Sequence, residues 1–526
     1  MINMSTNKSS PRHPHHHIAK SASLISIATV VSRVLGFIRD ILIAQFFGTA
    51  QSAQAFVVAF RIPNLFRDLV GEGAANAAVV PVFSEYLAKE RKEEFWKLFN
   101  VVMNLFLIVT AVITLLGIFF APLIVKIMAP GFIRSPEKLL LTIKLTRIMF
   151  PYLVLIAVTA YGMGVLFTFR SFFAPAFAPC LLNLAMITAA MLASGRMPEP
   201  VVGLAVGVVA GGILQLLFQV PPLFRRGMQI MPVKDFRHPA ARKIGRLLLP
   251  RVFGSAVYQL NLMVDTICAS LGFVVGEGAV AAIYYANRVI QFPLGVFGVA
   301  LASVVLPTLS GYAAQKDAGR FKDTLSFSLR GITLIMFPCA VFLLVLSQPI
   351  IRVLFQRGEF DGYSTQITAW ALLFYALGLF SYSGVKILVS SFYSLQDTVT
   401  PVKIAGVCLI VNAVLNIILM WPLKVGGIAL ASAASATLNY FLLYAQIKKR
   451  IGVLRIGLRQ YLFKVMTAAA LMFLLTFILW NRFFLQLDPL THLAITVFAG
   501  VAGFIVFCLF LRVKEMQDLW LWILNR

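Results

Sequence analysis

The sequence predicts an all-α polytopic membrane protein of about fourteen transmembrane helices: two parallel-repeat six-helix lobes plus two C-terminal helices. Of its 526 residues 60% are hydrophobic and 13% are charged, and the mean hydropathy is +0.88, far above the range of soluble chains. Apolar runs of about 20 residues or more recur along the chain, each long enough to cross a hydrocarbon core of about 30 Å. The third observation is an internal repeat, described below.

The charged residues predict the orientation of the chain. Lys and Arg number 46 against 20 Asp and Glu, and they gather in alternate loops such as 225–246 and 448–459, whereas the loops 48–53 and 272–279 contain none. By the positive-inside rule, the basic loops and both termini are expected in the cytoplasm of a bacterial inner-membrane protein. We therefore expect membrane lipids, and no nucleic acid, as partners of these basic loops.

The predicted spans divide the chain into six regions. Residues 1–21, with four of the six histidines, are expected to be a disordered cytoplasmic tail, and the five cysteines, all in apolar segments, are interpreted as core residues. No cleavable signal peptide is apparent. The further regions are an N-lobe (22–224), a basic linker (225–248), a C-lobe (249–450), two C-terminal helices (451–513) and a cytoplasmic tail (514–526).

An internal repeat relates the two lobes. The stretch 80–86, VPVFSEY, returns at 306–312 as LPTLSGY, and we call the displacement from Val80 to Leu306 the repeat shift. Other landmarks keep nearly the same displacement, including Asp40 with Asp265. Because six spans is an even number, the second copy enters the membrane in the same direction as the first. This is typical of transporters and predicts a site between the two lobes.

Two arginines interrupt the first apolar segment, where Val31 to Asp40 reads VSRVLGFIRD. A charge at the bilayer centre costs roughly 3 to 15 kcal/mol, so Arg33 and Arg39 predict a ligand path or a wet cavity. Gly36 between them is a candidate hinge that could bend the helix. Internal ion pairing is the alternative interpretation for Arg33 and Arg39, with Asp40 as a possible counter-ion; Arg33 and Asp40 are seven residues, or about two turns, apart.

The second lobe supplies a further cation. Arg288 lies in a span without a carboxylate, beside the neutral Asn287 and Gln291, and therefore has no local ion-pair partner. Arg288 together with Arg33, Arg39 and Arg67 would form a cationic cluster. The planar fork of arginine favours a phosphate-bearing ligand.

Several stretches resemble the MurJ (MviN) family of lipid II flippases: SRVLGFIRD (32–40), AFVVAFRIPNLFR (55–67), GEGA (71–74), VVPVFSEY (79–86), FAPAFAP (173–179) and YYANRVIQFPLGVFGVALASVVLPTLS (284–310). The resemblance implies the fold of the multidrug/oligosaccharidyl-lipid/polysaccharide exporter superfamily, with a groove for the lipid tail along the C-terminal helices. It also implies that lipid II is bound by a set of substrate residues, supported by Ser32, Asp40, Asn287 and Gln291. The implied substrate residues are Arg33, Arg39, Arg67, Arg288 and Glu72.

The chain departs from its enterobacterial relatives at Gln54, Asn287 and Gln291, where those relatives have acids. These amides cannot carry protons or form obligatory salt bridges, which puts a proton-coupled mechanism through them in doubt.

A second polar set is a candidate sodium site, by resemblance to relatives thought to bind sodium. Its members are Asp265, Asn412, Asn416 and Ser432, whose oxygens suit a hard cation. Hydrogen bonding between helices is the alternative explanation. No other cofactor is expected.

The sequence therefore predicts a lipid II flippase of the inner membrane, acting in peptidoglycan biosynthesis and cell shape by alternating access, and not an enzyme. Cell-wall synthesis proteins are further candidate partners. The alternatives are an exporter of another lipid-linked oligosaccharide or of drugs, a membrane enzyme, and a scaffold. No nucleophile, metal or paired-carboxylate motif supports the enzyme, and a scaffold gains nothing from buried charge.

Overall fold

A computed structural model describes residues 14–70, 76–89, 92–231, 238–452, 458–483 and 486–524. All regular structure in these ranges is helical, which confirms the predicted all-α class. The first half of the chain contains α1 (Pro14–Phe47), α2 (Gln51–Val70), α3 (Asn76–Ala88), α4 (Lys92–Phe119), α5 (Ala121–Met128), the 3-10 helix η2 (Pro130–Arg134), α6 (Pro136–Met149), α7 (Tyr152–Thr168), α8 (Phe173–Ala193) and α9 (Pro200–Arg225). Helix α1 begins inside the stretch 1–21 that was expected to be a disordered tail.

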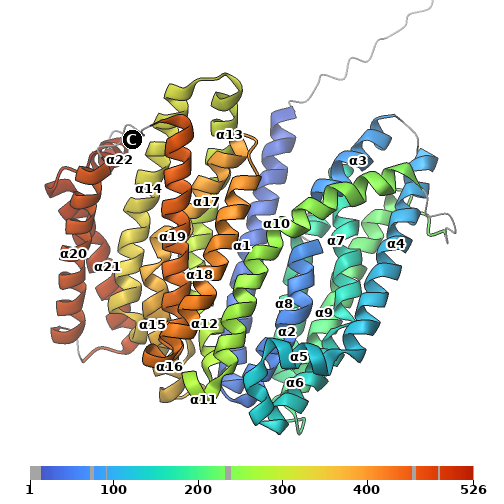
Figure 1. The fold of residues 1–526 in the computed structure, drawn as a ribbon, viewed down its shortest axis with the longest axis horizontal. Helices are drawn as coiled ribbons and strands as arrows, with labels where there is room; N and C mark the ends of the chain where they lie inside the picture. Colours follow the sequence, from blue (N-terminus) through green and yellow to red (C-terminus); the bar gives the residue numbers. More distant parts are fainter. Residues whose placement is uncertain are drawn as a thin grey trace, which may run out of the picture. The chain divides into compact units, whose positions relative to one another are not determined.

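The second half continues the helical pattern (Figure 1). It contains α10 (Pro239–Ser270), α11 (Gly272–Val275), α12 (Ala279–Pro293), the π-helix η3 (Leu294–Val299), α13 (Ala300–Ala314), α14 (Ala318–Val345), α15 (Ser347–Phe355), α16 (Gly362–Leu377), α17 (Leu379–Ser394), α18 (Val399–Leu423), α19 (Val425–Ile451), α20 (Leu458–Arg482), α21 (Pro489–Phe510) and α22 (Lys514–Leu524).

Ten described helical segments are long and apolar enough to cross a membrane. The pair α16 and α17, bent by 46° at their junction, adds an eleventh if it is one span. Helix α1 is not among them, because Arg33, Arg39 and Asp40 interrupt its apolar stretch. The chain is therefore a multi-pass membrane protein, and the count of about fourteen spans stays a prediction.

The chain forms two compact units that do not follow the repeat. Unit 1 contains residues 1–42, 60–121 and 144–253. Unit 2 contains residues 43–59, 122–143 and 254–526, so it takes two short segments from the first half of the sequence. Helices α1, α2, α6 and α10 each run from one unit into the other. The lobe boundaries predicted from the repeat stay predictions.

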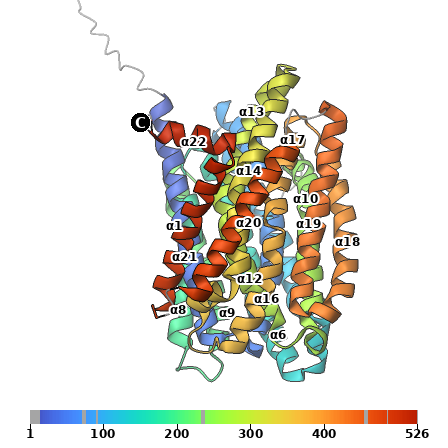
Figure 2. The same cartoon turned by 90° about the vertical axis from the view of Figure 1, so that its left-hand side faces the viewer.

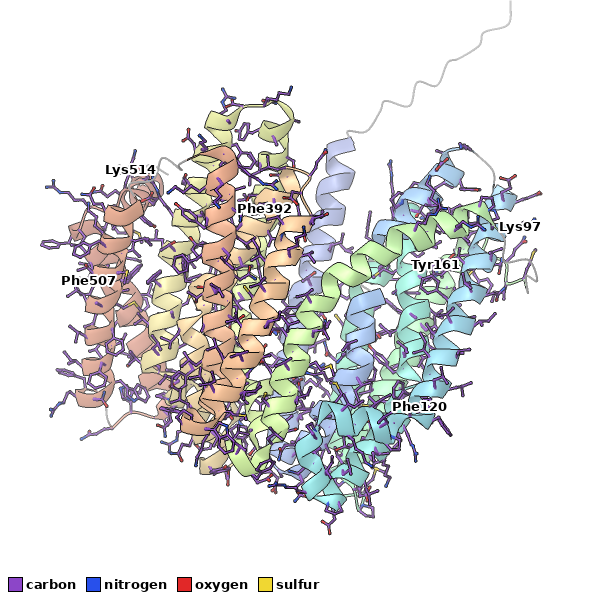
Figure 3. All side chains as sticks on the ribbon, in the orientation of Figure 1. Lys97, Phe120, Tyr161, Phe392, Phe507 and Lys514 are labelled. Carbon is purple, nitrogen blue, oxygen red and sulfur yellow. The ribbon has the colours of Figure 1, made fainter. Side chains whose placement is uncertain are left out.

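Unit 1 has an aromatic core around Tyr161 of α7, which is labelled in Figure 3. The ring of Tyr161 stacks on Phe99 and Phe106 of α4, with ring centroids 5.3 and 5.6 Å away. Its hydroxyl donates a hydrogen bond to the main-chain oxygen of Phe99 at 3.1 Å. Burial of these large rings fixes α7 against α4, since aromatic side chains contribute both area and preferred geometry.

Unit 2 has a separate core where α14, α20, α21 and α22 meet. Helices α20 and α21 lie side by side in Figure 2. Arg330 of α14 forms an ion pair with Glu515 of α22 at 2.9 Å, and the hydroxyl of Tyr461 in α20 donates to the main-chain oxygen of Arg330. Four cysteines are buried and Cys339 is half-buried, all as free thiols, which confirms their interpretation as core residues.

Candidate substrate site and ion cluster

Arg39 is a buried arginine held by its neighbour in the sequence. Its side chain lies in unit 1, and the residue is only 7% exposed. Both Nε and Nη2 donate to Oδ1 of Asp40, at 3.1 and 2.8 Å. This ion pair offsets part of the cost of burying the guanidinium, and the alternative of internal pairing is therefore correct for Arg39.

Asn183 of α8 is a second partner of Arg39 that sequence reasoning missed. Its Oδ1 accepts from Nη1 of Arg39 at 2.8 Å, and its Nδ2 donates to the main-chain oxygen of Ser32 at 3.0 Å. One side chain therefore joins α8 to two points of α1 that lie about two turns apart. The only sequence signal was a single amide in an otherwise apolar helix.

Arg33 has different surroundings from Arg39, because its side chain is exposed. Within the described part of the chain it forms no hydrogen bond or ion pair, so the alternative of pairing with Asp40 is wrong for Arg33. Helix α1 continues without a break through Gly36, and the hinge stays a prediction. The predicted ligand Glu72 lies outside the described residues, and so does the side chain of Arg67.

Arg288 in unit 2 contacts the neutral side chains of Tyr284 and Gln291. Its Nη2 donates to the hydroxyl of Tyr284 at 3.1 Å, and its guanidinium lies over the ring of Tyr284, 4.8 Å from the centroid. Its Nη1 lies 3.5 Å from Oε1 of Gln291, and Nε2 of Gln291 donates to Oδ1 of Asn287 at 2.5 Å. These contacts orient the cation without adding a negative charge, since an amide, a phenol and an aromatic ring are neutral.

Gln54 is the third amide at a position where the family resemblance implies an acid. It is 3% exposed in unit 2, and its Nε2 donates to the main-chain oxygen of Thr49 at 3.3 Å. In this arrangement the side chain closes a local turn at the start of α2.

The four residues of the predicted ion set meet in unit 2, and we call them the Asp265 cluster: Asp265 (α10), Asn412 and Asn416 (α18) and Ser432 (α19). Ser432 and Asn416 donate to the two carboxylate oxygens of Asp265 at 2.7 and 2.8 Å. Asn412 and Asn416 are fully buried, and within the described residues Oδ1 of Asn416 accepts no hydrogen bond.

The chemistry of the Asp265 cluster fits a monovalent cation. Flipping the Asn416 amide end over end exchanges its nitrogen and oxygen, which have nearly the same shape. The flipped amide would direct an oxygen toward the Asp265 carboxylate, next to the Ser432 hydroxyl. A hard cation such as sodium prefers oxygen ligands of this kind, and the charge of Asp265 would balance it.

The fold and these intramembrane charges define a polytopic helical transporter. The family model described as "Lipid II flippase MurJ" matches residues 43–498. A probable lipid II flippase MurJ of Vibrio cholerae serotype O1 is 34% identical over 517 residues, which cover 95% of this chain and 97% of that protein. The lipid II flippase MurJ of Burkholderia cenocepacia is 37% identical, covering 81% and 83%. The chain belongs to the MurJ lipid II flippase family.

Solved structures agree with this assignment. The structure titled "Lipid II flippase MurJ, inward closed conformation" is 27% identical, with a TM-score of 0.79, and the match covers 93% of this chain and 99% of that one. An inward-facing multidrug resistance MATE family transporter of the MOP superfamily is 14% identical with a TM-score of 0.69, covering 82% and 99%. The second likeness shows the shared fold alone.

Proposed function

We propose that this chain moves lipid II from the inner to the outer leaflet of the bacterial inner membrane by alternating access. The observation that carries the proposal is the family match along residues 43–498, supported by relatives aligned over most of their own length. Both termini are assigned to the cytoplasm, in keeping with the basic loops. Cell-wall synthesis proteins are the partners expected to supply or consume lipid II.

The pyrophosphate of lipid II is the group that the arginines are proposed to bind. Arg33 and Arg288 are the principal ligands in this proposal, because Arg33 is exposed and the Tyr284 and Gln291 groups that orient Arg288 are neutral. Arg39 contributes less direct binding, since Asp40 and Asn183 already accept from its guanidinium. Arg67 and Glu72 are proposed to complete the site, as the family resemblance implies.

Rescue of cells depleted of their own flippase tests this function. Expression of the parent chain should restore growth, whereas Arg288→Ala should abolish rescue at equal protein level. Arg288→Lys should rescue poorly, because an ammonium cannot donate two parallel hydrogen bonds to a pyrophosphate. Arg196→Ala is the matched control, since Arg196 is exposed in the turn after α8. Full rescue by Arg288→Ala would refute the role of this cation in transport.

We propose that the Asp265 cluster binds sodium. A ligand that binds the folded state alone raises stability by RT ln(1 + [L]/Kd), so sodium should raise the thermal midpoint of the purified chain. Potassium or choline at equal ionic strength is the control. Asp265→Ala and Asn416→Leu should each remove the sodium-dependent increase. A midpoint that responds equally to sodium and choline would contradict the ion site while leaving lipid II transport untouched.

A further inference from the structure

Two segments from the first half of the chain pack against the second half within unit 2. They contain the turns that follow α1 and α5, and these turns contact the turns that follow α10 and α15. Two of these four turns belong to the loops without Lys or Arg, 48–53 and 272–279, which the charge pattern assigns to the periplasmic side. The two contact regions are therefore expected at the outer ends of the helices.

The first contact region, the hydroxyl junction, joins residues 45–49 to residues 358–364. The N–H of Glu359 donates to the main-chain oxygen of Gln45 at 2.9 Å. The hydroxyls of Thr49 and Ser364 are 2.8 Å apart. A Cβ added at Gly48 would come within 2.2 Å of the Glu359 carbonyl oxygen, so the two backbones touch directly. Only glycine permits this approach.

The second contact region, the lysine junction, joins residues 131–138 to residues 270–277. The N–H of Gly131 donates to the hydroxyl of Ser270 at 3.2 Å, and a Cβ at Gly131 would come within 1.9 Å of the Ser270 carbonyl oxygen. Nζ of Lys138 forms an ion pair with Glu277 at 2.8 Å. This junction therefore has the same close backbone contact, with an ion pair where the other has two hydroxyls.

The internal repeat relates the two junctions. The repeat shift carries 131–138 onto 357–364, and in reverse it carries 270–277 onto 44–51. Each junction is thus the repeat-related copy of the other, with the roles of the two halves exchanged. Lys138 corresponds to Ser364 under this shift, so the copies differ in the charge of the side chain that closes them.

The ion pair of the lysine junction is unevenly hydrated. The side chain of Lys138 is 3% exposed, whereas that of Glu277 is 64% exposed. The ammonium has lost its water, and its attraction to a carboxylate that stays in water is weak. The ring of Phe132, 4.9 Å from Nζ, adds a cation–π contact. Parting of the junction would return water to the ammonium.

We propose that Lys138 and Glu277 form a charge-controlled latch on the outer side of the chain. Burial of Lys138 favours the parted junction, and Glu277 holds the junction closed by balancing the ammonium. The hydroxyl junction has no ion pair at the corresponding place and is held by its backbone contact and by the hydrogen bond between Thr49 and Ser364. The latch would set how readily the outer side opens, and only this consequence rests on the outward transport proposed above.

The latch makes opposite predictions for its two members. Glu277→Gln leaves a buried ammonium with no balancing charge, which favours opening. Lys138→Met replaces the ammonium by an apolar chain of similar length, which removes the desolvation cost and favours closure. If the ion pair only stabilised the closed junction, Glu277→Gln and Lys138→Met would weaken closure to the same extent.

Disulfide formation across the hydroxyl junction would report closure. In the full chain with its five native cysteines replaced by alanine, Thr49→Cys and Ser364→Cys place two thiols where the hydroxyls are 2.8 Å apart. Membranes are oxidised and the initial cross-linking rate is measured. Glu277→Gln should lower the rate by about twofold to fivefold, as expected for an ion pair in which one partner stays in water. Lys138→Met should raise it.

The exposed ion pair between Lys144 and Glu199, with side chains 53% and 52% exposed, provides the matched control. Lys144→Met and Glu199→Gln should leave the cross-linking rate unchanged. Equal slowing by Glu277→Gln and Lys138→Met, or no effect of either, would overturn the latch. Because cross-linking needs no lipid II, a latch that behaves as expected in a chain that fails to rescue growth would refute the transport function alone.

Discussion

Arg33 and Arg39 lie six residues apart on one helix and meet opposite environments. Arg39 is buried between Asp40 and Asn183, whereas the side chain of Arg33 is exposed. A buried guanidinium that loses a partner keeps its desolvation cost, whereas Arg33 has no partner among the described residues to lose. The two arginines should therefore differ in what their loss does to stability and to transport.

Asn183→Leu should destabilise the chain by about 1 to 3 kcal/mol, because Nη1 of Arg39 would lose its buried acceptor. Arg33→Leu should leave the thermal midpoint unchanged and abolish growth rescue. Thermal unfolding in detergent, followed in parallel with rescue, separates the two effects. An unchanged midpoint for Asn183→Leu would mean that the amide is not needed to hold Arg39.

The sequence predicted the Asp265 cluster as one set, and its four residues do meet. Asn412 and Asn416 are spaced one turn apart, so a regular helix places them on one face. The contact of Asn183 with Arg39 was out of reach, since it depends on how closely α8 approaches α1. For Arg288 the sequence showed that no carboxylate lies in the same span. It did not predict the contact with Tyr284, whose ring and hydroxyl both contact the guanidinium.

At the scale of elements, helix α16 begins with a capping residue that also supports the hydroxyl junction. Asp361 accepts from the N–H of Ser364 at 2.8 Å, and the Ser364 hydroxyl meets Thr49. The hydrogen bond from the Ser364 backbone holds the pKa of Asp361 below its ordinary value. The cap therefore stabilises the fold fully above the unfolded pKa of about 3.9 and is lost as the pH falls through the lowered folded value.

Asp361→Ala should lower stability by about 1 kcal/mol at pH 7 through loss of the cap. The difference from the parent should shrink as the pH falls below the unfolded pKa of about 3.9 and through the lowered folded value, because the parent carboxylate then protonates as well. Thermal midpoints measured across this pH range would test both points. Asp361→Asn keeps an amide cap without a charge, and its stability should follow the parent at pH 7. A pH-independent difference for Asp361→Ala would contradict this account.

At the scale of the whole molecule, the contact units cut across the repeat. Helices α1, α2, α6 and α10 connect the units, and the candidate pyrophosphate ligands Arg33 and Arg288 belong to different units. The repeat could be recognised in the sequence because several residues and motifs of the first half recur in the second half at nearly the repeat shift. The contact units were not readable, since they depend on which turns touch after folding.

Depolarisation should slow the outward movement of lipid II. The substrate is anionic, and an inside-negative potential is worth about 2.3 kcal/mol per charge per 100 mV for export. Vesicles with the parent chain, with and without an imposed potential, would be compared by the accessibility of lipid II in each leaflet. The sodium gradient is held constant and then varied separately. Equal rates with and without the potential would exclude it as a driving force.

The repeat gave each half of the chain an acid at nearly the same position, Asp40 and Asp265. Asp40 forms an ion pair with Arg39, the residue next to it in the sequence. Asp265 met Asn416 and Ser432 instead, which supply hydrogen bonds but no charge. Asp40 thus meets a partner on its own helix, whereas the hydrogen-bond donors of Asp265 come from α18 and α19. A substitution in α18 or α19 can therefore disturb the surroundings of Asp265, while the ion pair of Asp40 needs no other helix.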